Sequence, residues 1–251
     1  MSQTAFNQAQ FDAIYPRGIE KHYWNSARNR IIHHWLIKHG KKSAKMLEVG
    51  CGKGIVVEYL RNHGVNCFGV ETAPIVPLAP VNSFIKTGID HASMDEEFRR
   101  SIDTVLLFDV IEHVPDEAVF INSIRTAFPN LKMIVATVPA RMELWSNYDE
   151  YNGHFRRHSI KTLKQLSNKL SVSFSNFSYL FHELYLPALI LILLLRKRDT
   201  QISAPNGWKV FIHKLLSDYF FLDYLLIPRQ VLGTSILFNF DLNQTKIYKN
   251  I

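Results

Sequence analysis

One stretch near the start of the chain, Lys45 to Gly54 (KMLEVGCGKG), constrains the fold most. A short apolar run leads into glycines at alternate positions, Gly50, Gly52 and Gly54, and then into the helical pattern IVVEYL. This order predicts a strand, a glycine loop and a helix. Glycine suits such a loop because a backbone without a Cβ accepts positive φ and close approach, while the helix N-terminus offers free N–H groups.

A second apolar run follows about 20 residues later and ends in Glu71, whose carboxylate could accept both hydroxyls of a ribose. The loop and Glu71 together predict a nucleoside-cofactor site. The third glycine comes one residue too early for the dinucleotide pattern G-x-G-x-x-G, because Ile55 stands where the last glycine would be. A G-x-x-x-x-G-K-[ST] phosphate loop is also absent from this region, so nothing favours a nucleoside triphosphate.

The pattern E-V-G-C-G-K-G, followed by an acidic strand end, resembles the class I S-adenosylmethionine-dependent methyltransferases. This resemblance implies an α/β, Rossmann-like fold with a seven-stranded, mostly parallel sheet, an antiparallel last strand and helices on both faces. It also implies S-adenosylmethionine as the cofactor. The cofactor-binding residues that it implies here are Glu48, Gly50, Cys51, Gly52, Gly54 and Glu71.

Residues 5–42 are predicted to form a helical segment before the first strand. Its stretch HYWNSARNRII resembles the aromatic cap that many small-molecule methyltransferases of this class place over the cofactor. That resemblance implies that Tyr23, Trp24 and Arg28 line the methionine end, with Arg28 able to pair its carboxylate. The alternative is that Trp24 packs the helix on the core and Arg28 is solvated.

Three prolines in residues 73–80 predict a loop or a short helix between the second and third strands. The third strand is expected at 83–86, and Asp90 follows it. In the resembling family an acidic residue near this point hydrogen bonds the adenine amino group. A helix cap or turn is the alternative role for Asp90.

A buried strand is predicted at residues 102–108, and D-V-I-E-H-V-P-D follows it. This segment resembles the equivalent motif of the ubiquinone-biosynthesis-like methyltransferases. The resemblance places Phe108, Asp109 and Val110 beside the cofactor and Glu112 and His113 at the active-site rim. His113 is a candidate base, although it could instead only orient the loop that Asp116 caps into a helix at 117–128.

A fifth strand at 132–138 leads into a long aromatic loop, residues 144–158, which resembles a loop of the same group except that His158 stands where tyrosine is usual. Such a long loop in a compact domain is typical of a functional segment. His154 is our first candidate for the base that takes a proton from the acceptor. The expected acceptor-binding residues are Trp145, Tyr148, Arg156 and Arg157.

Two alternatives remain open for this loop. His154 and one arginine could tie the loop down through Asp149 and backbone carbonyls. A metal site built from Asp149, His154 and His158 is not expected, because their spacing matches no standard ligand set.

A helix at 159–170, a sixth strand at 172–181 and a seventh at 232–240 complete the expected sheet. The intervening insertion, 182–231, contains the apolar run Leu184 to Leu195 followed by R-K-R. Twelve apolar residues are too few to cross a bilayer, which needs about 20. The insertion could instead contact a membrane surface, cover an apolar acceptor pocket, form a dimer interface or pack as extra core.

At 251 residues and 47% hydrophobic content, the chain is expected to form a single methyltransferase domain: a cap at 5–42, a core at 43–181 and 232–243, and the insertion. The net charge of +7 favours an anionic substrate, membrane surface or nucleic acid, or is simply a solvated surface. Two cysteines and a polar N-terminus suggest a reducing compartment, cytoplasmic or membrane-associated.

We therefore expect methylation of a small molecule, at oxygen, on a lipid-linked, quinone-like or glycan acceptor. Nucleic-acid methylation is a less favoured alternative, because the fourth-strand segment lacks the N/D-P-P-Y type of motif. Protein methylation and a non-catalytic binding role on the same fold are further alternatives.

Overall fold

The computed structural model describes residues 11, 13–41, 43–195 and 203–242, and in this part of the chain seven strands form one sheet. The strand order is β3-β2-β1-β4-β5-β7-β6. β7 is antiparallel to both of its neighbours, and the other pairs are parallel. The expected mostly parallel Rossmann-like sheet with an antiparallel last strand is therefore confirmed. The strands are β1 (Lys45–Val49), β2 (Asn66–Glu71), β3 (Ile85–Thr87), β4 (Thr104–Phe108), β5 (Met133–Pro139), β6 (Ser173–Leu180) and β7 (Ser235–Asp241).

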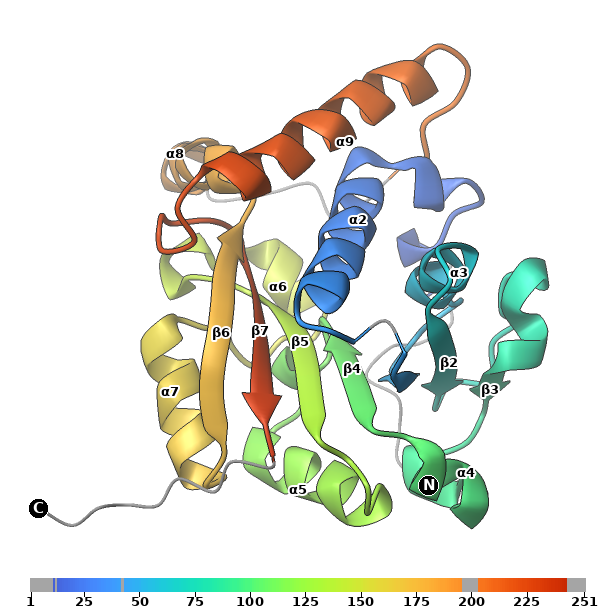
Figure 1. Cartoon of the computed structure of the whole chain (residues 1–251). Coiled ribbons are helices and arrows are strands. Elements are labelled where there is room, and N and C mark those ends of the chain that lie inside the picture. Colours follow the sequence, from blue (N-terminus) through green and yellow to red (C-terminus); the bar gives the residue numbers. More distant parts are fainter. Residues whose placement is uncertain (1–10, 12, 42, 196–202, 243–251) are drawn as a thin grey trace, which may run out of the picture.

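Helices cover both faces of this sheet (Figure 1). Along β4, Val105 and Leu107 belong to the core beneath α5 and α7, whereas Leu106 and Phe108 belong to the core beneath α2 and α3. This alternation is the period of two that a strand buried on both faces requires. The helices of the core are α2 (Tyr23–Lys38), α3 (Ile55–Asn62), α4 (Glu96–Ser101), α5 (Glu117–Ala127), α6 (Asn147–Tyr151) and α7 (Ile160–Lys169).

Local sequence signals set several of these boundaries. Asp116 caps α5 by accepting hydrogen bonds from the backbone of Ala118 and Val119, and Ser159 opens α7 with a capping box. The proline-rich stretch is a loop that ends in a 3-10 helix, Ala79–Phe84, as the prolines predict.

Two expected segments differ in the structure. The N-terminal cap is not one helix, because Pro16 and Gly18 (φ 91°) separate its first residues from a 3-10 helix, Ile19–Lys21, and from α2. The third strand begins two residues later than the apolar pattern suggests, since the 3-10 helix takes up Ser83 and Phe84. Residues 5–10 of the expected cap and the R-K-R run lie outside the described residues.

The insertion forms a 3-10 helix, His182–Leu184, and two helices, α8 (Tyr185–Leu195) and α9 (Lys209–Leu226). Both lie over the end of the sheet where β6 ends, and α9 runs beside α2 (Figure 1). α9 is anchored there by Phe220 in the core and by Asp223, whose Oδ2 lies 2.9 Å from His182 Nδ1. Among the described residues, no helix combines the length and hydropathy needed to cross a membrane.

Candidate functional site

The glycine loop after β1 lies at the carboxyl end of the parallel strands and forms part of the wall of a cavity of about 1200 Å³. Gly50 adopts φ 75°, and a Cβ there would come within 2.9 Å of Val110 Cγ2. Glycine is therefore required for both conformation and space. Ligands of open α/β sheets bind at this edge of the sheet, so the loop stands where the sequence predicts a cofactor.

Most of the residues expected to bind the cofactor line this one cavity. They come from α2, the ends of β1, β2 and β4, and the loop after β3. Those that line it are Tyr23, Trp24, Arg28, Glu48, Gly50, Cys51, Glu71, Asp90, Phe108, Asp109 and Val110.

Gly52 and Gly54 are not among the lining residues. Gly54 begins α3, and a Cβ on it would meet Ile85 Cδ1 at 2.1 Å, so its neighbour is the third strand. Gly52 is covered by Tyr15, whose hydroxyl oxygen would lie 2.1 Å from an added Cβ. Tyr15 itself lines the cavity, although the sequence analysis did not single it out. Tyr15 belongs to no recognisable sequence motif. It reaches the glycine loop only because of the way the N-terminal segment folds.

Glu71 is held in place by the backbone of the glycine loop. Its Oε2 accepts a hydrogen bond from the Gly52 N–H at 3.0 Å, and its Oε1 accepts one from the Ala73 N–H at 3.0 Å. These contacts orient the carboxylate at the strand end. Asp90 accepts a hydrogen bond from the Ala92 N–H at 2.8 Å and so caps a short 3-10 helix while also lining the cavity. The two roles considered for Asp90 are therefore compatible.

Arg28 crosses from α2 to the end of β4. Its Nη1 donates to Asp109 Oδ2, and its guanidinium lies over the Trp24 ring with 4.5 Å to the ring centroid. Asp109 adopts φ 56°, a left-handed conformation that is unusual for a residue with a side chain. Its Oδ1 accepts a hydrogen bond from Thr137 at 3.1 Å. Strained residues of this kind concentrate at functional sites.

Glu48 is a buried carboxyl group at the cavity wall, and its Oε2 has no hydrogen-bond partner among the described residues. Burial raises the pKa of Glu48 to about 8, against the nearby positive charge of Arg28 and together with the negative charges of Glu71 and Asp109. Glu48 is therefore protonated at neutral pH.

This elevated pKa predicts how stability depends on pH. A carboxyl group whose pKa is raised by folding stabilises the protein fully below its ordinary pKa, and this contribution is lost as the pH rises through about 8. As the pH rises from about 5 to about 9, the melting temperature of the Glu48→Gln variant should therefore fall less than that of the wild type. Scanning calorimetry measures this, with Glu97→Gln on the exposed face of α4 as the control that keeps the wild-type slope. Parallel slopes for Glu48→Gln and the wild type would contradict the assignment.

The loop after β5 is organised by Asp149, whose side chain is fully buried. Its Oδ1 lies 2.9 Å from His154 Nδ1 and accepts a hydrogen bond from Arg157 Nε at 2.8 Å, while Oδ2 accepts one from the Ser146 N–H at 2.9 Å. Burial would raise the pKa of Asp149, but the hydrogen bond with His154 and the charge and hydrogen bond of Arg157 hold it below its ordinary value. The loop is thus tied down through Asp149, which is the alternative that the sequence left open.

Of the other residues in the loop after β5, some line the cavity and some do not. Tyr148, His154 and Arg157 line the cavity. Arg156 points elsewhere, because it donates to the Pro115 carbonyl at 2.7 Å and pairs with Glu117 at 3.0 Å. Trp145 is not among the lining residues. His158 is buried, with its Nε2 3.0 Å from Glu117 Oε1.

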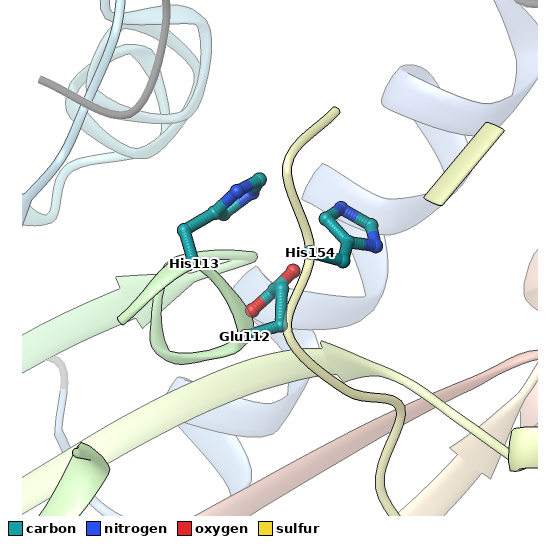
Figure 2. Close-up of side chains that lie close together, drawn as sticks. All are labelled: Glu112, His113 and His154. Carbon is teal, nitrogen blue, oxygen red and sulfur yellow. The ribbon is translucent and has the colours of Figure 1, made fainter. Parts of the chain in front are cut away.

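His113 and Glu112 reach the same part of the cavity from the turn after β4. The rings of His113 and His154 meet edge to face with 4.6 Å between centroids (Figure 2). Burial and the neighbouring His154 lower the pKa of His113 to about 4, so its imidazole is neutral at physiological pH. Burial and the Asp109 carboxylate raise the pKa of Glu112 well above its usual range. One cavity therefore joins the glycine loop to a pair of histidines.

The residues present fit S-adenosylmethionine. The carboxyl groups of Glu71 and Asp109 suit a ligand that carries sulfonium and ammonium charges, and the protonated carboxyl group of Glu48 offers a buried oxygen without a partner among the described residues. The sheet order, the glycine loop and the acidic strand ends are those of a class I S-adenosylmethionine-dependent methyltransferase. A sequence model of the methyltransferase domain family matches residues 20–170, and the chain belongs to this family.

Curated relatives match at low identity. The chain is 30% identical over 108 residues to the ubiquinone biosynthesis O-methyltransferase of Pseudomonas aeruginosa, covering 39% of this chain and 46% of that protein. It is 26% identical over 144 residues to the mitochondrial ubiquinone biosynthesis O-methyltransferase of Arabidopsis thaliana, covering 50% of this chain and 45% of that protein. The chain thus spans about half the length of these relatives.

A solved structure shares the fold over most of the chain. The phospholethanolamine N-methyltransferase 2 of Haemonchus contortus, in complex with phosphomonomethylethanolamine and S-adenosylhomocysteine, superimposes with a TM-score of 0.54 at 16% identity. The match covers 93% of this chain and 60% of that one. At this identity the likeness establishes the shared fold alone.

Proposed function

We propose that this chain binds S-adenosylmethionine at the glycine loop and methylates a hydroxyl group of a small, apolar acceptor. The observation that carries the proposal is the single cavity in which the loop and the acidic strand ends face His113 and His154. When bound, S-adenosylmethionine supplies the electrophilic methyl group. Glu48, Gly50, Cys51, Glu71, Asp90 and Asp109 are the residues that would hold it, with Tyr23, Trp24 and Arg28 covering its methionine end.

Methylation at oxygen is supported by His154, since a hydroxyl group must lose its proton and imidazole is suited to accept it near neutral pH. The Asp149 carboxylate holds His154 Nδ1, which leaves Nε2 to act on the acceptor. The naming of the curated relatives as O-methyltransferases points the same way. Tyr148 and Arg157 contribute to the wall around this position.

An apolar acceptor is supported by α8. Five uncharged residues line the cavity here. Leu184 lies directly before α8, and the others lie within it: Pro187, Ala188, Leu191 and Ile192. The same helix is exposed on its outer side, where Leu186, Leu193 and Leu194 are 63%, 69% and 75% exposed. α8 therefore separates the cavity from the surface by a single apolar layer.

α9 extends this exposed apolar surface. Its buried side packs against α2, and its outer side exposes Phe211, Leu222 and Leu226 at 62%, 52% and 77%. Exposed apolar surface of this extent, with Lys209 and Lys214 on the same helix, suits a lipid surface with anionic head groups. We therefore propose that α8 and α9 contact a membrane from which the acceptor enters.

Calorimetry with S-adenosylhomocysteine tests the cofactor part of the proposal. We expect stoichiometric binding to the full chain, and an intact fold with no measurable binding would refute it. Incubation of the protein with methyl-labelled S-adenosylmethionine and cell extract tests the acceptor. Label should enter the lipid-soluble fraction as a methyl ether, whereas label in protein or nucleic acid would favour the alternative acceptors.

Flotation with anionic phospholipid vesicles tests the membrane contact. The Leu194→Glu variant should bind these vesicles at least about tenfold more weakly than the wild type, because a charge replaces an apolar side chain at the proposed contact. Val119→Glu is the matched control, since Val119 is 67% exposed on α5, away from this surface. Equal loss in both variants, or a concentration-dependent dimer in place of vesicle binding, would contradict the proposal.

A further inference from the structure

The first turn of α2 is capped by two histidine side chains that lie far apart in the sequence. The Trp24 N–H donates to His22 Nδ1 at 3.3 Å, and the Tyr23 N–H donates to His213 Nδ1 at 3.1 Å. The first N–H groups of a helix have no partner within the helix, so each contact satisfies a donor that the helix itself leaves open. His213 belongs to α9, and the insertion therefore supplies one of the two capping groups.

These contacts define the protonation state of both imidazoles. A ring nitrogen that accepts a hydrogen bond carries no proton, so Nδ1 is unprotonated in His22 and in His213. Burial and the neighbouring His213 lower the pKa of His22 to about 4, and burial and the charge of Lys209 lower the pKa of His213. Both side chains are therefore neutral at physiological pH and remain acceptors for the start of α2.

α9 also holds the side chains of this turn. Ser217 Oγ donates to Ser26 Oγ at 3.0 Å, and the Tyr23 ring stacks on the Phe220 ring with 5.5 Å between centroids. The two helices run side by side from this point (Figure 1). α9 thus fixes both the backbone and the side chains at the start of α2.

The first two turns of α2 carry the residues that we expect at the methionine end of the cofactor. Tyr23, Trp24 and Arg28 line the cavity. The Arg28 guanidinium lies over the Trp24 ring, so its position depends on the turn that bears Trp24. His213 lines the same cavity, which places the cap at the wall of the ligand site and not on a remote face of the helix.

We propose that α9 completes the cofactor site, with His213 as a positioning residue for the methionine end. Its Nδ1 holds the first turn of α2 in the conformation that directs Tyr23 and Trp24 at the cofactor. This inference rests on the proposed function, because it assigns a role within the S-adenosylmethionine site. Without the cap the turn would fray, and the cofactor would have to reorder it on binding, which lowers the apparent affinity. The insertion then serves the cofactor as well as the acceptor.

Calorimetry on the full chain with two ligands tests this role. S-adenosylhomocysteine has the amino-acid part of the cofactor, whereas 5′-methylthioadenosine keeps the adenosine and the sulfur but lacks that part. The His213→Leu variant should bind S-adenosylhomocysteine about tenfold more weakly than the wild type, which is the effect expected for one lost helix cap. Its affinity for 5′-methylthioadenosine should be unchanged, since α2 is expected to contact only the methionine end.

Two further variants separate positioning from packing. In His213→Asn the side-chain oxygen takes the place of Nδ1 and can accept from the Tyr23 N–H, so this variant should bind S-adenosylhomocysteine as the wild type does. His34→Leu is the matched control. His34 lies on α2 and meets the rings of Phe221 and Tyr224 of α9 edge to face at 5.8 Å between centroids, but it does not line the cavity. Its replacement should lower the melting temperature and leave the affinity unchanged.

The possible outcomes separate this inference from the proposed function. Unchanged S-adenosylhomocysteine binding in His213→Leu, or an equal loss for both ligands, would refute the positioning role while the methyltransferase proposal stands. A loss in His213→Asn as large as in His213→Leu would exclude the capping hydrogen bond as its cause and overturn the assignment. A wild-type chain that does not bind S-adenosylhomocysteine would instead refute the proposed function, and this inference with it.

Discussion

Replacing Gly52 with leucine is expected to weaken S-adenosylhomocysteine binding by at least about 100-fold, a loss of roughly 2.7 kcal/mol. Gly52 adopts φ 53°, and its added Cβ would lie 2.1 Å from the Tyr15 hydroxyl oxygen. The new side chain must therefore displace Tyr15 from the cavity wall. It would also disturb the Gly52 N–H, which holds Glu71 at 3.0 Å. Calorimetry on the folded variant measures the effect.

Gly64→Leu is the matched control for this experiment. Gly64 has φ 77°, so leucine suffers a similar left-handed strain of about 1–2 kcal/mol there. An added Cβ at Gly64 would meet no atom within 4 Å, and the residue does not line the cavity. Gly64→Leu should melt at a lower temperature than the wild type but bind S-adenosylhomocysteine with the same affinity. Wild-type affinity in Gly52→Leu would show that this loop does not hold the cofactor.

The second large effect is expected on stability when Asp149 is replaced with alanine. This carboxylate accepts hydrogen bonds from Arg157 Nε and from the Ser146 backbone and holds His154, and it is fully buried. Its removal leaves the Arg157 guanidinium, which is only 5% exposed, without its carboxylate. Breaking a buried pair from one side costs about 3–5 kcal/mol. Urea unfolding followed by circular dichroism measures the change.

Asp218→Ala provides the comparison. Asp218 pairs with two cationic side chains, Arg30 and Lys214, but all three side chains are at least 41% exposed. Exposed pairs contribute little because water screens them. If Asp149→Ala were no less stable than Asp218→Ala, the loop after β5 would not depend on its buried carboxylate.

The apolar pattern and capping signals of the sequence predict most of the sheet and its core helices. Each of these signals acts within one element: Ser159 caps the helix that follows it, and the run at 104–108 has the composition of a buried strand. The resemblance of G-C-G-K-G and D-V-I-E-H to one family implied a mostly parallel sheet with an antiparallel last strand, whereas the order of the strands is seen only in the structure. The break in the N-terminal cap was missed, although Pro16 and Gly18 are local signals that interrupt a helix.

Side-chain pairings across the site could not be predicted in the same way. Asp149 could have met either arginine of the R-R pair, and the structure joins it to Arg157 while Arg156 turns to Glu117. Tyr15 reaches Gly52 across the N-terminal segment, and Glu112 reaches His154 from another strand end. Such contacts depend on the relative placement of segments that are far apart in the chain.

The sequence by itself determined the glycine loop, the acidic strand end at Glu71 and the family, because these depend on residue types at short spacings. Only the tertiary structure shows which charged side chains form ion pairs and how Tyr15 covers the glycine loop. It also shows that the insertion forms two helices over the cavity. The physical reason is that backbone conformation follows local sterics and hydrogen bonding, whereas burial and ion pairing depend on every element that packs around a side chain.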